Sequence, residues 1–154
     1  GIGPRHFTFH PNNRKVFVIN ELGGSVSSYD LGKDGSLNLI ESVDTLPDDF
    51  IGDSWTADIH TSIDGNYVYG SNRGHDSIAI FKFDESKNTL INIGHHSSLG
   101  ETPRNFATSP DGKFLFVANQ DTSNIATLKI NDDGSLSDTG YNLEIPSPVC
   151  IKFL

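Results

Sequence analysis

The stretch Gly70-Ser71-Asn72-Arg73-Gly74-His75-Asp76-Ser77-Ile78-Ala79-Ile80-Phe81 predicts the end of one β-strand, a tight polar turn and the start of a second strand. The same pattern occurs upstream at residues 19–26 and downstream at residues 118–125. In each copy an asparagine ends an apolar strand, and the residue after it differs, being Glu21, Arg73 or Gln120. Such a scaffold, with a different polar side chain at one equivalent position, is how a repeat protein can build a site.

A second set of matches defines the length of the repeat. Residues 4–12 resemble residues 103–111, and residues 56–65 form a looser copy between them. The asparagine at the end of the apolar strand recurs with spacings of 52 and 47 residues. A period near 50 residues that carries only β signals predicts stacked four-stranded units of an all-β propeller.

Each unit divides into four short strands. The first strands are expected at 6–10, 58–62 and 105–109, the second at 15–19, 67–69 and 114–117, the third at 25–31, 77–83 and 124–130, and the fourth at 37–43, 90–96 and 136–141. The second strand is apolar on both faces, which predicts that it is sandwiched between neighbouring sheets. The fourth is the most polar, as suits an outer edge.

The domain organisation expected is one partial propeller over residues 1–154, with blades at approximately 3–46, 54–99 and 102–146. Residues 147–154 resemble another first strand and are expected to close a ring, with Cys150 buried in that strand. Because the chain contains no Met and begins inside a repeat, we expect the C-terminal part of a longer chain.

Three blades cannot close a ring alone, so an apolar face should remain open at each end. These faces should be built from residues such as Val16, Val18, Phe114 and Phe116. A monomer rarely exposes such patches, so the expected partners are the missing N-terminal blades or a second copy of the chain.

Composition excludes several classes of protein. The formal net charge of −9 argues against nucleic acid and anionic membranes as partners. There is no apolar run near the roughly 20 residues of a membrane helix. The single cysteine excludes an internal disulfide and fits a cytoplasmic location. No zinc or calcium spacing is present, so neither a metal nor a cofactor is expected.

Several motifs together resemble one known family. They are Gly3-Pro4-Arg5-His6, Asn20-Glu21-Leu22, Ala57-Asp58-Ile59-His60, and the stretches at residues 71–78, 100–106 and 147–153. In order and over nearly the whole chain, they resemble the seven-bladed β-propeller lactonases, which include 6-phosphogluconolactonases and carboxy-cis,cis-muconate cyclases. The resemblance implies the last three blades and the closing strand. It also implies a hydrolase of a sugar-acid lactone, with 6-phosphogluconolactone of the pentose phosphate pathway as the best candidate.

The resemblance also implies an active site of one Glu, two Arg and one His at the mouth of the central channel. The Glu and one Arg correspond to Glu21 and Arg5. The second Arg corresponds to Arg73, with Arg104 as the alternative. The His belongs to a blade before residue 1, so the chain alone is expected to be catalytically weak.

The residues themselves support the same chemistry. A carboxylate can deprotonate a water molecule, and guanidinium groups can hold a phosphate or stabilise an oxyanion. Since Glu21 and Arg73 occupy equivalent positions in consecutive units, they should point into the same channel mouth. A structural ion pair between blades would use the same residue types and stays an alternative.

The expected substrate-binding residues around this centre are Arg104, His60, His75, Gln120 and His6. For each histidine, the competing interpretation is a turn residue bonded to the backbone. Two other functions stay open: a muconate-lactonising enzyme, and a propeller without catalysis that serves as an interaction scaffold. Lactone turnover would separate them.

Overall fold

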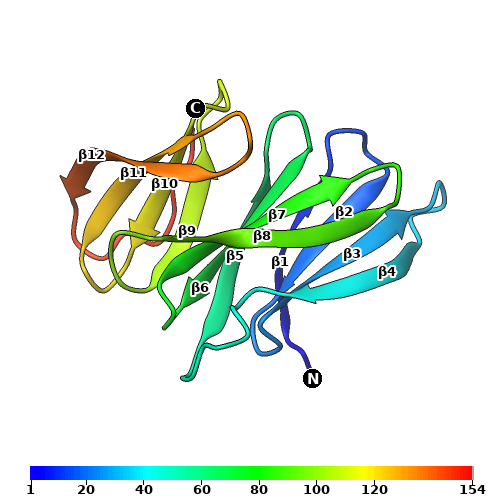
Figure 1. The fold of residues 1–154 in the computed structure, drawn as a ribbon, viewed down its shortest axis with the longest axis horizontal. Coiled ribbons are helices and arrows are strands. Elements are labelled where there is room, and N and C mark those ends of the chain that lie inside the picture. Colours follow the sequence, from blue (N-terminus) through cyan, green and yellow to red (C-terminus); the bar gives the residue numbers. More distant parts are fainter. Residues whose placement is uncertain (154) are drawn as a thin grey trace.

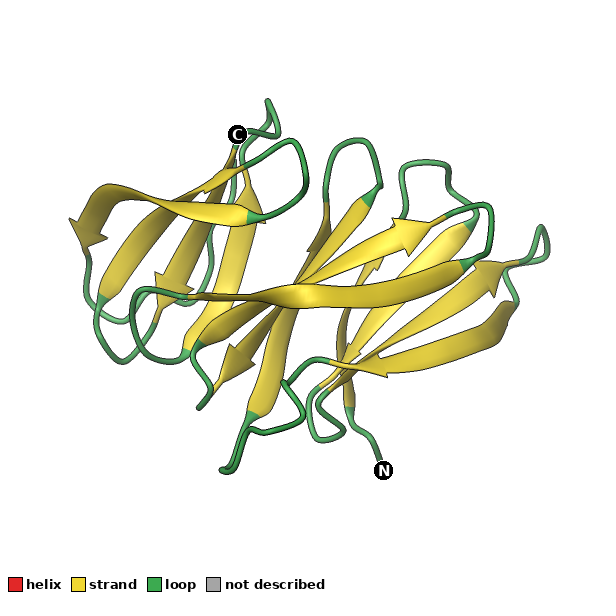
Figure 2. Cartoon of the chain, viewed as in Figure 1, coloured by secondary structure: helices red, strands yellow, loops and turns green. Residues whose placement is uncertain are grey.

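The computed structural model describes residues 1–153, which form twelve β-strands and no helix (Figures 1 and 2). No segment in that range is therefore a helix able to cross a membrane. The first sheet contains β1 (Pro4–Phe9), β2 (Lys15–Asn20), β3 (Ser25–Leu31) and β4 (Leu37–Asp44). The second contains β5 (Trp55–Thr61), β6 (Tyr67–Arg73), β7 (Ser77–Asp84) and β8 (Thr89–Ser97). The third contains β9 (Pro103–Thr108), β10 (Phe114–Asn119), β11 (Asn124–Ile130) and β12 (Leu136–Glu144).

Each sheet is an antiparallel meander in chain order, so the predicted all-β fold with three four-stranded units is confirmed. Figure 1 shows the three sheets side by side in the order of the chain. The first strands β1, β5 and β9 contact one another in turn, and the fourth strands lie at the outer edges. The beginnings of the first strands and the ends of the second strands therefore meet at one end of the sheets.

The hairpin turns follow from local polar residues. Between β5 and β6, Asp64 Oδ1 accepts hydrogen bonds from Ser62 Oγ (2.6 Å) and the Asn66 amide (3.0 Å). Gly65 between them has φ of +78°, a conformation that glycine adopts without strain. An aspartate bonded to the backbone two residues on is a common turn device.

Two apolar clusters hold the sheets together. The first joins Phe17 and Ile19 of β2 to Val68 of β6. The second joins Tyr69 of β6 to Leu115 of β10. Because Val68 and Tyr69 are adjacent and point to opposite faces, β6 is buried on both sides, as predicted for a second strand.

The outer faces of the first and third sheets have no neighbouring sheet among residues 1–153. The most exposed apolar side chain on the first sheet's outer face is Phe7, at 62 %, and Phe9 lies beside it. Val16, which was expected to be exposed there, is only 3 % exposed. Its cross-strand partners Phe9 and Tyr29 flank it on the same face, so larger neighbours cover it.

The repeated asparagines link each sheet to the one before it. Asn72 Nδ2 donates to the Thr45 carbonyl at 2.9 Å, and Asn119 Nδ2 donates to the Ser98 carbonyl at 2.9 Å. Asn20 instead donates to Ser25 and Ser27 in its own sheet. The Asn at the end of the second strand is thus a junction residue as well as a turn residue.

The expected closing strand at residues 147–154 does not form in the described part of the chain. Residues 145–153 contain no strand, and Leu154 lies outside the described residues. In Figure 1 this segment runs back along the third sheet, where the Ile151 amide donates to Asn105 Oδ1 at 2.7 Å. A strand needs a second edge to pair with, and residues 1–153 provide no edge of a fourth sheet. For the same reason Cys150 is exposed, not buried as expected.

Candidate active site

Arg5, Glu21 and Arg73 form one cluster, as predicted. Arg5 lies near the start of β1, Glu21 follows β2, and Arg73 ends β6 of the next sheet. Glu21 Oε1 accepts a hydrogen bond from Arg73 Nη2 and lies 3.8 Å from Arg5 Nε. The exposed fractions of the side chains are 17 % for Arg5, 34 % for Glu21 and 15 % for Arg73, so the carboxylate is the most accessible member.

Strand β5 holds the two guanidinium groups side by side. Arg5 Nη1 donates to the Ala57 carbonyl at 2.6 Å, and Arg73 Nη2 donates to the Thr56 carbonyl at 3.1 Å. These are successive residues of one strand. The positions of both cations are therefore determined by backbone carbonyls as well as by Glu21, which is the rigidity that a binding site needs.

The cluster is locally cationic although the chain is acidic. The pKa of Arg5 is lowered by burial first and by the charge of Arg73 second, while the charge of Glu21 opposes both effects. The charge of Arg104 lowers it further, so the third arginine also acts on this site. A cationic centre in a chain of net charge −9 can attract an anion that the rest of the surface repels.

Asp58 is the residue that sequence reasoning missed. It lies in β5, is only 4 % exposed, and receives hydrogen bonds from all three sheets. His6 Nδ1 of β1 lies 2.7 Å from Oδ1, and His60 Nε2 lies 3.2 Å from Oδ2. Asn105 Nδ2 of β9 also donates to this carboxylate. A signal for this role exists in the sequence, because Asp58 is a carboxylate flanked by the apolar residues Ala57 and Ile59.

The position equivalent to Asp58 is occupied by His6 in the first sheet and Asn105 in the third, by register with β2 and β10. These three side chains therefore form a hydrogen-bonded chain across the three sheets. Burial alone would raise the pKa of Asp58, but hydrogen bonds from His60 and His6, the charge of His60 and the Phe106 amide outweigh it and lower the pKa to about 2. Asp58 is thus a stable anion at neutral pH.

A cavity of about 390 Å³ lies beside this chain of residues. It is lined by Arg5, His6, Asp58 and His60 on one side and by Val149 to Lys152 of the C-terminal segment on the other. Arg5 contributes to both the cavity and the carboxylate cluster, so the two features form one continuous site.

Two candidate residues remain, Gln120 and His75, and their described contacts differ. Gln120 occupies the position equivalent to Glu21 and Arg73, and only its backbone amide, bonded to Thr102, has a described partner. His75 is directed elsewhere, because its Nδ1 lies 2.6 Å from Ser77 Oγ and its ring packs against Phe50 and His95. Burial, followed by the charge of His95, lowers the pKa of His75.

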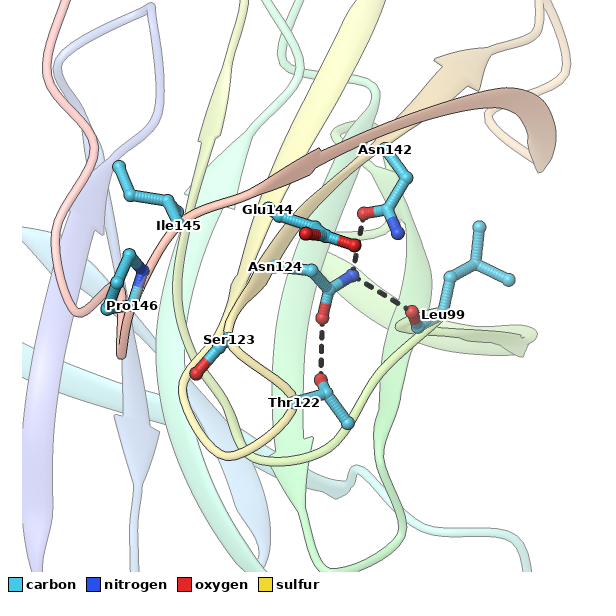
Figure 3. A pocket seen from close by; sticks show the side chains of 8 residues that line it. All are labelled: Leu99, Thr122, Ser123, Asn124, Asn142, Glu144, Ile145 and Pro146. Carbon is cyan, nitrogen blue, oxygen red and sulfur yellow. Dashed lines mark hydrogen bonds between the residues drawn. The ribbon is translucent and has the colours of Figure 1, made fainter.

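A larger pocket of about 600 Å³ lies at the far edge of the third sheet (Figure 3). There Asn124 is bonded to Thr122, the Leu99 carbonyl and Asn142. The Ile145 amide donates to the Ser123 carbonyl. At the two sheet junctions, the amides of Thr45 and Ser98 make the equivalent bonds. At those junctions the side chains of Asn72 and Asn119 fill the position that corresponds to this pocket. We therefore interpret the pocket as a packing surface.

No group of three or more His, Cys, Asp or Glu side chains within residues 1–153 is arranged to hold a metal ion.

Comparison with known proteins agrees with this architecture. The family described as "Lactonase, 7-bladed beta-propeller" matches residues 1–153. The chain belongs to the seven-bladed β-propeller lactonase family. Its three sheets are therefore a segment of a seven-bladed propeller.

Individual relatives show how much of the family fold the chain spans. It is 36 % identical over 156 residues to the 6-phosphogluconolactonase of Bacillus subtilis (strain 168), covering 100 % of this chain and 45 % of the relative. It is 46 % identical over 132 residues to the 6-phosphogluconolactonase of Formosa agariphila, covering 84 % of this chain and 36 % of the relative.

A solved structure of the family is covered to a similar extent. The periplasmic gluconolactonase of Pseudomonas aeruginosa superposes with a TM-score of 0.94 and 31 % identity, covering 100 % of this chain and 43 % of that protein. The chain thus spans less than half the length of these propeller lactonases.

Proposed function

We propose that this chain provides part of the active site of a lactone hydrolase, with 6-phosphogluconolactone as substrate and 6-phosphogluconate as product. The observation that carries the proposal is the carboxylate of Glu21 held between the guanidinium groups of Arg5 and Arg73. Family membership and the names of the two curated relatives support the same reaction.

The geometry suits an anionic lactone. Each guanidinium has five N–H donors, and Arg5 and Arg73 spend only part of them on Glu21 and on β5 carbonyls. The remaining donors can bind a phosphate or the carbonyl oxygen of the lactone, where negative charge develops during attack. Glu21 uses Oε1 for both arginines, which leaves Oε2 to accept a proton from the attacking water.

Neighbouring residues are proposed as substrate-binding groups. Arg104 adds positive charge, and His6 and His60 line the adjacent cavity. Gln120 stands at the repeat position of Glu21 and supplies a neutral donor and acceptor. We leave His75 out of the proposed site, since its contacts are with Ser77, Phe50 and His95.

The test is hydrolysis of 6-phosphogluconolactone by the intact natural protein, followed by acid release near neutral pH. Glu21→Gln should lower kcat/KM by roughly 100-fold or more, because loss of a positioned base and of the charge that holds two arginines both act on the transition state. Glu85→Gln is the matched control: it removes a carboxylate in an outer turn that bonds only Asn12, and it should leave the rate unchanged.

Two results would overturn the proposal in different ways. No turnover of the lactone by the wild-type protein would refute the function, and formation of a muconate lactone instead would identify the cyclase activity. Full activity of the Glu21→Gln variant would refute the site while leaving the function standing.

We also propose that the working protein combines these three sheets with the remaining blades of the propeller, either from the same chain or by self-association. The relatives' greater length supports this. The single cysteine supports a reducing compartment such as the cytoplasm.

A further inference from the structure

Hydrolysis of a lactone needs two proton transfers, and Glu21 accounts for one of them. Water attacks the carbonyl carbon and loses a proton, and the ring oxygen gains a proton when the carbon–oxygen bond breaks. A sugar alkoxide is a poor leaving group, so a positioned acid at the ring oxygen lowers the barrier. Among residues 1–153, two histidines contact one buried carboxylate and are candidates for that task.

We propose that His6 is the general acid that protonates the departing ring oxygen, and that Asp58 is the positioning residue that orients its imidazole. This inference rests on the proposed lactone hydrolysis and adds a catalytic residue to it. The supporting features are the hydrogen bond between His6 Nδ1 and Asp58 Oδ1 (2.7 Å), the burial of Asp58, and the place of His6 at the cavity wall.

The hydrogen bond to Asp58 determines which ring nitrogen can serve. Because Nδ1 donates to a buried carboxylate, Nε2 is the nitrogen left to carry a proton toward a ligand. Arg5 Nη1 lies 3.5 Å from Nδ1 and 3.4 Å from Nε2, so the guanidinium contacts the ring of His6. The His6 side chain is 44 % exposed, so part of the ring is open to a ligand.

His60 also contacts Asp58 but is less suited to act as the general acid. Its contact with the carboxylate is longer, at 3.2 Å, and its ring packs edge-on against Phe106 at 4.9 Å. His6 also adjoins Arg5, which contacts Glu21, so the proposed acid and base flank the same guanidinium.

Several charges act on the imidazole of His6. Asp58 of β5 contacts its Nδ1, Arg5 of β1 contacts the ring, and His60 of β5 contacts the same carboxylate. Arg104 of β9 acts on the neighbouring Arg5, and Lys152 of the C-terminal segment lines the same cavity. Asp58 is the one negative charge in direct contact with the ring, and it balances the proton that the acid must carry.

The proposed step balances in atoms and charge. Water oxygen bonds to the carbonyl carbon and its proton passes to Glu21 Oε2. The bond from that carbon to the ring oxygen then breaks, and the proton on His6 Nε2 passes to the ring oxygen as it leaves. The products are a hydroxyl group and a carboxylic acid, and the proton on Glu21 returns to His6 directly or through solvent.

The experiment is the pH dependence of kcat for 6-phosphogluconolactone with the intact natural protein. Activity should decline as pH rises, because a general acid must carry its proton to act. His6→Gln should lower kcat about 100-fold with a KM change of less than about threefold, and it should abolish that decline. The half-buried His96 of β8 provides the matched control, and His96→Gln should behave as wild type.

Asp58→Asn tests the positioning role. Loss of the ordered imidazole should lower kcat while leaving KM nearly unchanged, a split that a purely structural residue would not give. If that variant fails to fold, His6→Gln still decides, because His6 is partly exposed and near the surface.

Three results would contradict the inference. They are a His6→Gln variant that keeps the wild-type pH profile, one that loses activity only through KM, and a His60→Gln variant that alone abolishes the decline. A wild-type protein without lactonase activity would instead refute the proposed function on which the inference rests.

Discussion

Replacing the buried carboxylate of Asp58 should change how the stability of the protein depends on pH. The side chain is 4 % exposed and accepts hydrogen bonds from His6, the Ile59 amide, His60, Asn105 and the Phe106 amide. Asp58→Asn keeps the shape but replaces one acceptor oxygen by a donor amide. It therefore tests whether the carboxylate holds the first strands of the three sheets together.

The size of the effect follows from the pKa of Asp58, which is about 2 in the folded protein and ordinarily 3.8. At about 1.4 kcal/mol per pKa unit, the difference corresponds to about 2 kcal/mol of folding free energy at neutral pH. Because the folded-state pKa is the lower one, this stability is complete above about pH 4 and is lost as the pH falls toward 2. About half of it should be gone by pH 3.

The assay is urea unfolding of the intact natural protein, followed by the fluorescence of Trp55 at the start of β5. The difference in unfolding free energy between wild type and Asp58→Asn should shrink by about 1.5 kcal/mol between pH 5.5 and pH 2.5. Asp48→Asn, which alters an exposed loop carboxylate, should show no such change. A difference that stays constant over this range would refute the reasoning, because Asp58 would then not titrate at a lowered pKa.

Two further predictions concern packing and assembly. Gly65→Ala should destabilise the protein by about 2 kcal/mol more than Gly35→Ala. Both glycines have positive φ, but only at Gly65 would the new Cβ collide with a buried ring, that of His10, and equal losses in urea unfolding would contradict this contact. The purified 154-residue chain should associate in sedimentation velocity runs at tens of micromolar, because Phe7 and its apolar neighbours are uncovered, and a well-folded monomer would show that these faces tolerate water.

Much of the fold could be predicted because turn chemistry and strand periodicity are local. The bounds of β3 and β11 agree with the sequence, since polar turn residues flank both strands. β6 and β12 extend to Arg73 and Glu144, beyond the predicted ends, because their pairing with the adjacent strand continues past the last apolar residue. The closing segment forms no strand within residues 145–153, because a strand depends on a partner edge, which residues 1–153 do not provide.

The candidate site was also only partly predictable from the sequence. Glu21 and Arg73 could be placed together because repeat equivalence converts sequence position into spatial position. Asp58 stands at the repeat position of His6 and Asn105, so the same equivalence brings these residues together, but the hydrogen bonds between them depend on side-chain direction, which the repeat does not reveal. His75 was expected among the substrate-binding residues, but its side chain turns back to Ser77 in its own hairpin.

The central claim is that Arg5, Glu21 and Arg73 form the anion-binding centre of a lactonase. It is tested most directly by calorimetric titration of the intact natural protein with 6-phosphogluconate, the proposed product. Arg73→Gln should weaken binding about 10- to 100-fold, since a charge-assisted hydrogen bond contributes about 1.5 to 3 kcal/mol. Arg14→Gln, which alters an exposed arginine next to β2, should bind as tightly as wild type. Equal affinity in the wild type and the Arg73→Gln variant would contradict the claim.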